Sequence, residues 1–162
     1  MSNLGFIKAM ESAGISVIAT PVGDRYVLEK MLSEDLIIGG EQSGHIINRL
    51  FANTGDGILT ALQILQVMAR TKKSLKDLAA VMQRFPQVLL NVREVDKDRL
   101  SSSTAISAAV KNAELELGNS GRVLLRASGT EKLVRVMVEA NSDNLAHKIA
   151  NDLVKVVKAE LG

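Results

Sequence analysis

Apolar residues recur along the chain with two different periods, one typical of helices and the other of buried strands. Residues 4–13 carry apolar side chains at helical spacing and end at Gly14, and "ISVIAT" at 15–20 then predicts a buried strand. We expect the first half to continue with a helix at 23–32, short strands at 36–40 and 44–47, and helices at 54–71 and 74–85. We expect the N-terminal ends of these helices to be capped by Asp24, Asp56 and Ser74.

The pattern changes at Phe85-Pro86, because proline disfavours the helical conformation of the residue before it. A β-α-β-β-α order is predicted beyond this point, with a strand at 87–95, a helix at 103–118, strands at 121–127 and 133–140, and a helix at 144–161. We therefore place one domain at 1–85 and a second at 86–162, with a boundary near 85–98. The first domain begins with a helix and would leave a sheet edge uncovered, so we expect the chain to be part of a larger protein.

Composition excludes several classes of function. The chain has 46% hydrophobic and 23% charged residues, as soluble globular proteins do. Its net charge of +2 comes from 20 basic and 18 acidic residues that form no block, which argues against a nucleic-acid or membrane surface. No apolar run reaches the roughly 18–20 residues of a membrane span. The absence of cysteine excludes disulfides and cysteine-based zinc sites and is consistent with a cytoplasmic protein.

The stretch "LLRASGTEKLVRV" at 124–136 interrupts two strands with a Ser-Gly-Thr turn. If Arg126 faces Leu133 across the hairpin, both Arg126 and Arg135 project from one face near the turn. Two guanidinium groups, turn hydroxyls and the backbone N–H groups around Gly129 would suit a phosphate. The alternative interpretation is an ordinary glycine turn with two solvated arginines.

The stretch "GEQSGH" alternates a carboxylate, a hydroxyl and an imidazole, from Glu41, Ser43 and His45. An extended backbone would direct all three to one side, where they could bind the vicinal hydroxyls of a sugar. The alternative interpretation is a polar turn with Glu41 solvated and His45 hydrogen-bonded locally.

Six ordered motifs together resemble the α-D-phosphohexomutase superfamily, most closely its bacterial phosphoglucosamine mutases. They are "MSNLGF" at 1–6, "VGDRYVLEKML" at 22–32, "GGEQSGHII" at 39–47, "NTGDGILTALQIL" at 53–65, "QVLLNV" at 87–92 and "RASGTEKLVRVMVEA" at 126–140. The resemblance implies an α/β fold made of the last two of four domains. These are a truncated α/β/α third domain at 1–85 and an α+β fourth domain at 86–162, whose antiparallel sheet carries two helices. It also implies a hinge near 85–98.

The resemblance implies roles for the two loops and for a third one. The loop with Glu41, Ser43 and His45 would contact sugar hydroxyls, and His45 would lie near the reacting end as a candidate auxiliary catalytic group. The residues that would line the substrate cleft beside it are Gly23, Asp24 and Arg25. Those that would hold the phosphate that is not transferred are Arg126, Ser128, Gly129, Thr130 and Arg135. The family often has proline where Ala127 and Lys132 stand, which predicts a less stiff loop.

The catalytic parts of such a mutase are expected elsewhere. The resemblance implies a phosphoserine from the first domain and Mg²⁺ held by the second, and neither an "SHNP"-like loop nor a D-G-D-x-D-R loop occurs here. Because phosphoryl transfer requires both parts, we expect the isolated chain to bind no metal and to be inactive. The implied partners are a hexosamine phosphate and the N-terminal domains. The alternatives are a part of a phosphomannomutase or phosphoglucomutase, and a non-catalytic sugar-phosphate-binding module.

Overall fold

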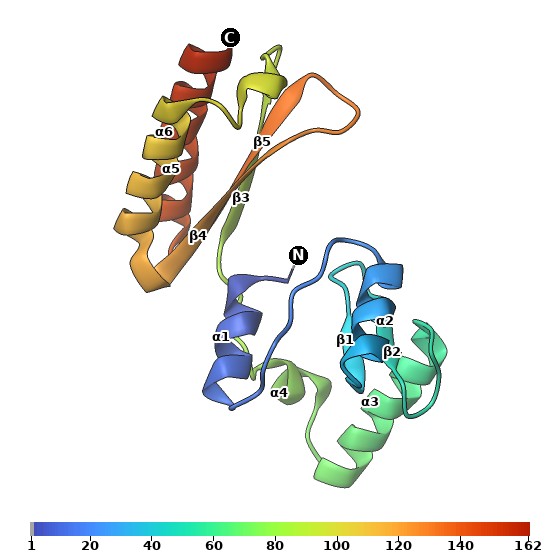
Figure 1. The fold of residues 1–162 in the computed structure, drawn as a ribbon. Helices are drawn as coiled ribbons and strands as arrows, with labels where there is room; N and C mark the ends of the chain where they lie inside the picture. The colour runs from blue at the N-terminus through green and yellow to red at the C-terminus, as the bar shows by residue number, and fades with distance from the viewer. Residues whose placement is uncertain (1) are drawn as a thin grey trace. The chain divides into compact units, whose positions relative to one another are not determined.

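The computed structural model describes residues 2–162, and the chain divides into two compact units, Met1–Gln83 and Arg84–Gly162. The first unit contains a two-stranded antiparallel sheet and four helices (Figure 1). Its elements are α1 (Leu4–Ser12), α2 (Asp24–Ser33), β1 (Ile38–Gly40), β2 (Ile46–Asn48), α3 (Gly57–Thr71) and α4 (Leu75–Ala79).

The core of the first unit forms where α2 lies on the short sheet. Val27 and Met31 of α2 and Ile47 of β2 are buried together. A Cβ on Gly39 of β1 would lie 2.4 Å from the Met31 sulfur, so only glycine lets the strand approach the helix this closely. No residue of α3 is buried, so this core is small.

Three expectations for the first unit are corrected. "ISVIAT" is not a buried strand: Ile15, Val17 and Ile18 are 52%, 36% and 42% exposed, because no strand within residues 2–162 pairs with this segment. The N-cap of α2 is Gly23, and Asp24 is the first helical residue. Ser74 does cap α4, but the helix ends at Ala79; Val81 is 70% exposed, so no packing surface supports a longer helix.

Arg49, which follows β2, closes the end of α2. Its Nη1 donates to the carbonyl oxygens of Met31 (3.1 Å) and Leu36 (2.9 Å) and to the Asp35 carboxylate (3.2 Å). Met31 lies in the last turn of α2, where its carbonyl oxygen also accepts the N–H of Leu36 at 2.8 Å, and Leu36 lies three residues beyond the helix. The guanidinium thus links α2 to β2.

We expect Arg49→Met to lower the unfolding free energy of the first unit by about 1–3 kcal/mol, because two partly buried carbonyl groups lose a charged donor. Tyr26, the single tyrosine of a chain without tryptophan, lies in α2 and gives a fluorescence signal for this unit during urea unfolding. The control is Arg70→Met on the exposed surface of α3, which should change the value by only a few tenths of a kcal/mol. Equal effects of the two substitutions would contradict the capping role.

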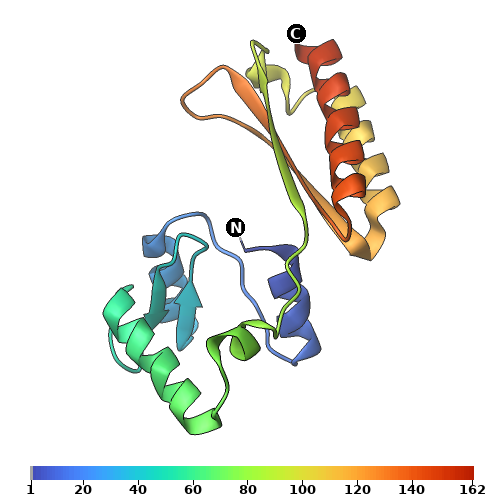
Figure 2. The same cartoon turned by 180° about the vertical axis from the view of Figure 1, so that it is seen from behind.

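The second unit is an antiparallel sheet with strand order β3-β5-β4 and two long helices. Figures 1 and 2 show α5 and α6 side by side on one face of the sheet, and no element of residues 84–162 covers the other face. The elements are β3 (Gln87–Arg93), the 3₁₀ helix η1 (Lys97–Arg99), α5 (Thr104–Leu117), the 3₁₀ helix η2 (Gly118–Ser120), β4 (Gly121–Ala127), β5 (Leu133–Ala140) and α6 (Asp143–Leu161). The predicted α/β class and the antiparallel sheet packed by two helices are confirmed.

The period of two in β5 decides which face is covered. Val134, Val136 and Val138 are fully buried and pack with α5 and α6 in one hydrophobic core. The intervening residues of β5, which include Arg135, therefore point to the face without helices. Arg126 of β4 pairs with Arg135, and residues paired across two strands project to the same face, so Arg126 lies on that face too.

Most of the range in which we predicted a hinge belongs to the second unit. β3 pairs with β5 from Gln87 to Arg93, and Val95 is 7% exposed in the core. The N–H of Asp96 donates to the carbonyl oxygen of Leu161 at 2.8 Å. Bending the chain within 87–96 would break these contacts.

Candidate functional site

The turn between β1 and β2 brings three of the predicted sugar-binding side chains together. Ser43 Oγ lies 2.9 Å from His45 Nδ1 and 3.4 Å from Glu41 Oε2, and His45 Nδ1 lies 3.9 Å from the same carboxylate oxygen. They converge because the chain turns, with Gly44 at φ 100° and a hydrogen bond from the Glu41 N–H to the His45 carbonyl oxygen at 2.9 Å. The expected extended backbone is therefore wrong, although the convergence is observed.

Glu41 also joins this turn to the loop before α2. Its Oε1 accepts a hydrogen bond from the N–H of Gly23 at 2.8 Å, and its side chain is 15% exposed. Gly23 has φ 133°, a conformation that other residues rarely adopt. One carboxylate oxygen thus fixes the two loops to each other, and the second faces Ser43 and His45.

The side chains of Asp24 and Arg25 do not join this cluster. Asp24 Oδ1 accepts the N–H of Arg25 at 2.8 Å, and Arg25 Nε donates to Glu29 Oε1 at 2.7 Å on the exposed side of α2. This hydrogen bond and the charge of Glu29 raise the pKa of Arg25 above its ordinary value. Of the predicted 23–25 loop, only the backbone of Gly23 contacts the turn.

Gly55 is a residue of this site that sequence reasoning missed. A Cβ on Gly55 would lie 3.1 Å from the His45 Cβ, so the loop before α3 rests against the histidine. Gly55 lies in the sequence motif "NTGDGILTALQIL", whose spacing gives no sign of a contact with His45. The lack of a side chain at Gly55 thus lets this loop lie close to His45.

The β4–β5 hairpin places Arg126 directly opposite Arg135. The predicted register, with Arg126 opposite Leu133, is wrong by two residues; a shift of two keeps both side chains on one face and brings them into direct opposition. Like charges opposed across a sheet repel each other. Among residues 2–162 no ion pair is described for either arginine, so an anion between them would remove an unfavourable interaction.

A third polar group extends this row across the sheet. Asn91 of β3 pairs with Arg135 on the other side of β5, so Asn91, Arg135 and Arg126 lie across three strands on one face. Sequence analysis missed Asn91, because only the three-stranded register shows that it lies in this row. Its amide offers a further hydrogen-bond donor.

The loop after β4 contributes backbone donors. Ser128 is buried: its N–H donates to Leu133 O (2.9 Å), and its Oγ accepts from Glu131 N–H (3.3 Å). Gly129 and Thr130 are exposed, and within the described chain their N–H groups have no hydrogen-bond acceptor. Ser128 thus shapes the turn, whereas the backbone of Gly129 and Thr130 remains available to a ligand.

The described residues do not fit a magnesium site. No group of three or more His, Cys, Asp or Glu side chains within residues 2–162 could hold a metal ion. Mg²⁺ requires several oxygen ligands in octahedral geometry. The residues described here therefore supply no ligand set for this ion. No helix in the same residues is long and apolar enough to cross a membrane.

Both units match models of one protein family. Residues 1–85 match phosphoglucomutase/phosphomannomutase, alpha/beta/alpha domain III, and residues 89–156 match the phosphoglucomutase/phosphomannomutase C-terminal domain. The chain belongs to the phosphoglucomutase/phosphomannomutase family. The two loops described above thus lie in its third and C-terminal domains.

Curated relatives in this family are much longer than the chain. It is 59% identical over 161 residues to a phosphoglucosamine mutase of Parafrankia sp. (strain EAN1pec), covering 99% of this chain and 34% of that protein. It is 57% identical over 162 residues to the phosphoglucosamine mutase of Streptomyces griseus subsp. griseus, covering all of this chain and 36% of that protein. The chain spans about a third of the length of these relatives.

Two solved mutase structures share the fold of this chain. An Aspergillus fumigatus N-acetylphosphoglucosamine mutase aligns with a TM-score of 0.77 at 17% identity, over 98% of this chain and 37% of that one. An N-acetylglucosamine-phosphate mutase, solved in its product complex, aligns with a TM-score of 0.76 at 22% identity, over 96% and 37%. At these identities the likeness shows the fold alone.

Proposed function

We propose that this chain is the sugar-phosphate-binding part of a phosphoglucosamine mutase, an enzyme that interconverts glucosamine 6-phosphate and glucosamine 1-phosphate on the cytoplasmic route to cell-wall amino sugars. The observation that carries the proposal is the opposed pair Arg126 and Arg135, without a described acidic partner, close to the N–H groups of Gly129 and Thr130. A phosphate dianion would accept hydrogen bonds from both guanidinium groups and relieve their repulsion.

In this proposal the C-terminal unit holds the phosphate that is not transferred. Asn91 adds a donor beside Arg135, and the buried Ser128 keeps the loop in shape. Fixing the dianion fixes one end of the sugar, and catalysis benefits because the reacting group is then oriented before the reaction.

The turn at 41–45 would bind hydroxyl groups of the sugar. Glu41 Oε2 offers an acceptor, and Ser43 and His45 each offer a donor or an acceptor, so the cluster matches the mixed pattern of a sugar. His45 would exchange a hydrogen bond or a proton with the substrate as an auxiliary group. Gly23, which is fixed by Glu41, would hold Asp24 and Arg25 at the edge of this site.

The phosphoryl-transfer machinery would come from the remaining two thirds of the protein. A phosphoserine would supply and accept the phosphoryl group, and Mg²⁺ would neutralise its charge. We place the hinge between the two units at about residues 83–85, because Pro86 O accepts the N–H of Ala140 and the residues from β3 up to Asp96 are also held within the second unit.

Titration of the 162-residue chain tests the proposal. We expect glucosamine 6-phosphate to bind with millimolar or tighter affinity, and glucosamine without phosphate to bind much more weakly, because the arginine pair recognises the anion. Mutase activity should be undetectable with or without Mg²⁺. Turnover by this chain would contradict the proposal.

Two other results would change the assignment. Stronger binding of mannose 6-phosphate or glucose 6-phosphate would favour the phosphomannomutase or phosphoglucomutase alternative. If activity is not restored when the N-terminal portion of a relative is added in trans while binding persists, a non-catalytic binding module is favoured.

A further inference from the structure

Three contacts join the segment 93–97 to the loop at 128–132, which we call the phosphate loop. Arg93 Nη1 lies 3.2 Å from Glu131 Oε1, Glu94 N–H donates to Lys132 O at 3.1 Å, and Lys97 Nζ donates to Ser128 O at 2.6 Å. We propose that Lys97 is a positioning residue that sets the conformation of the phosphate loop. As a role in ligand binding, this inference rests on the proposed function.

The three contacts differ in strength. The Arg93–Glu131 pair is 65% and 47% exposed, and exposed ion pairs of this kind contribute little. The Glu94 hydrogen bond is made by a residue with φ 58°, a left-handed backbone conformation that residues other than glycine seldom adopt. The Lys97 contact is short, partly buried and charge-assisted, which makes it the strongest of the three.

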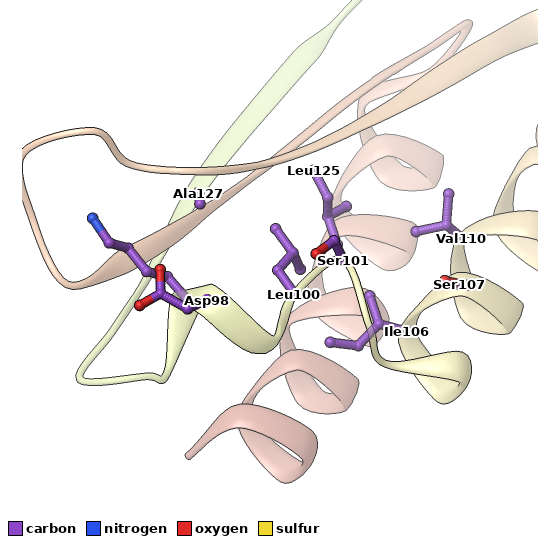
Figure 3. A pocket seen from close by; sticks show the side chains of 9 residues that line it. Asp98, Leu100, Ser101, Ile106, Ser107, Val110, Leu125 and Ala127 are labelled. Carbon is purple, nitrogen blue, oxygen red and sulfur yellow. The ribbon is translucent and has the colours of Figure 1, made fainter.

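Open space adjoins Ala127, the strand residue that precedes the phosphate loop. A pocket of about 650 Å³ opens between η1, the first turns of α5 and β4 (Figure 3). Its lining includes Lys97 and Ala127, and Ala127 is the residue directly before Ser128. Figure 3 shows the small Ala127 side chain apart from the larger ones of Leu100, Leu125 and Ile106. Leu133 O already holds the N–H of Ser128, whereas Lys97 holds its carbonyl group, which belongs to the same peptide unit as the N–H of Gly129.

The backbone of Lys97 is itself fixed to the core. Val95 is buried, and the Asp96 N–H donates to Leu161 O at the end of α6. The Asp96 side chain also accepts the N–H of Asp98 at 3.3 Å, which caps η1. A lysine anchored in this way fixes Ser128 relative to the core. The position of Ser128 in turn sets where the neighbouring N–H groups of Gly129 and Thr130 lie.

The test compares Lys97→Met and Lys97→Gln with Lys97→Arg, and uses Lys111→Met, an exposed lysine of α5, as the matched control. The first measurement is the position of the ¹⁵N–¹H NMR signals of Gly129 and Thr130 in the ligand-free 162-residue chain. We expect both neutral variants to shift these signals while the signals of α6 stay in place. Lys97→Arg, which retains a charged donor, should shift them less, and Lys111→Met should leave them unchanged.

The second measurement is the dissociation constant for glucosamine 6-phosphate in the same variants. We expect roughly tenfold weaker binding for Lys97→Met, the effect of one lost charge-assisted hydrogen bond, and substantial recovery for Lys97→Arg. The dissociation constant of Lys97→Met divided by that of the unchanged protein should stay the same in 0.5 M salt, because salt screens the field of a distant charge but not the position of the loop.

Unchanged loop signals in both neutral variants would overturn the inference, as would a loss of affinity that disappears in high salt. The outcomes also separate this inference from the proposed function. Shifted loop signals in a chain that binds no sugar phosphate at all would retain Lys97 as the residue that positions the loop and would refute the phosphate site.

Discussion

Replacing either Arg126 or Arg135 with alanine should weaken the binding of glucosamine 6-phosphate at least tenfold, and replacing both should abolish measurable binding. Each guanidinium would donate charge-assisted hydrogen bonds to the phosphate, and one such interaction contributes about 1.5–3 kcal/mol. Isothermal titration calorimetry or NMR titration of the chain measures the effect. The affinity of Arg126→Lys should lie between those of the unchanged protein and Arg126→Ala, because lysine keeps the charge but lacks the planar guanidinium group.

The matched control is Arg99→Ala in η1, an exposed arginine of the same unit whose loss changes net charge equally. It should leave the affinity within about twofold, since an exposed charge outside the site acts only through a screened field. Equal losses for Arg99 and Arg126 would indicate general attraction of an anion and not a built site.

The same substitution gives an independent result without ligand. Because Arg126 faces Arg135 directly, Arg126→Ala should not lower the unfolding free energy of the second unit and should raise it by about 0.2–1 kcal/mol. A residue that costs stability in the empty protein and is needed for binding would be retained for its function. A clear loss of stability would show that Arg126 serves the fold.

Leu153→Ala should produce the largest loss of stability, about 2–5 kcal/mol for the second unit. Leu153 lies on α6, is 3% exposed and belongs to the core against the sheet, so its truncation leaves a cavity that rigid strands cannot fill. Urea unfolding followed by the amide signals of α6 and β5 measures this unit separately.

The control for this second prediction is Leu115→Ala, the same chemical change at a residue of α5 that is 72% exposed. It should alter the unfolding free energy by no more than about 0.5 kcal/mol. If the two leucines cost the same, the sheet face that carries α5 and α6 is not the core of the unit.

Local sequence patterns were sufficient for the second unit. Each of its strands and long helices lies where periodicity predicted it, because the valines of β5 alternate strictly and α6 keeps an apolar face over five turns. The pattern fails at 15–20, where an apolar run predicts a buried strand but the segment is largely exposed. Burial depends on a neighbouring strand, which the run itself cannot reveal.

For the candidate site, the sequence predicts which residues take part better than how they are arranged. The residue types of the phosphate loop, the two arginines and the polar 41–45 stretch could be selected from the sequence, because their chemistry suits a sugar phosphate. Their geometry could not: the hairpin register differed by two residues, and the turn at Gly44 replaced the expected extended backbone. Arg25 was selected for the site, yet its side chain pairs with Glu29 on α2.

Local periodicity and side-chain chemistry are enough to specify where most helices and strands form and which residue types gather in the two loops. Long-range packing is what brings Asn91 beside the two arginines, Gly23 to Glu41, and Lys97 to Ser128. These contacts join residues that are distant along the chain, and their free energy depends on a register and a packing that no local pattern specifies.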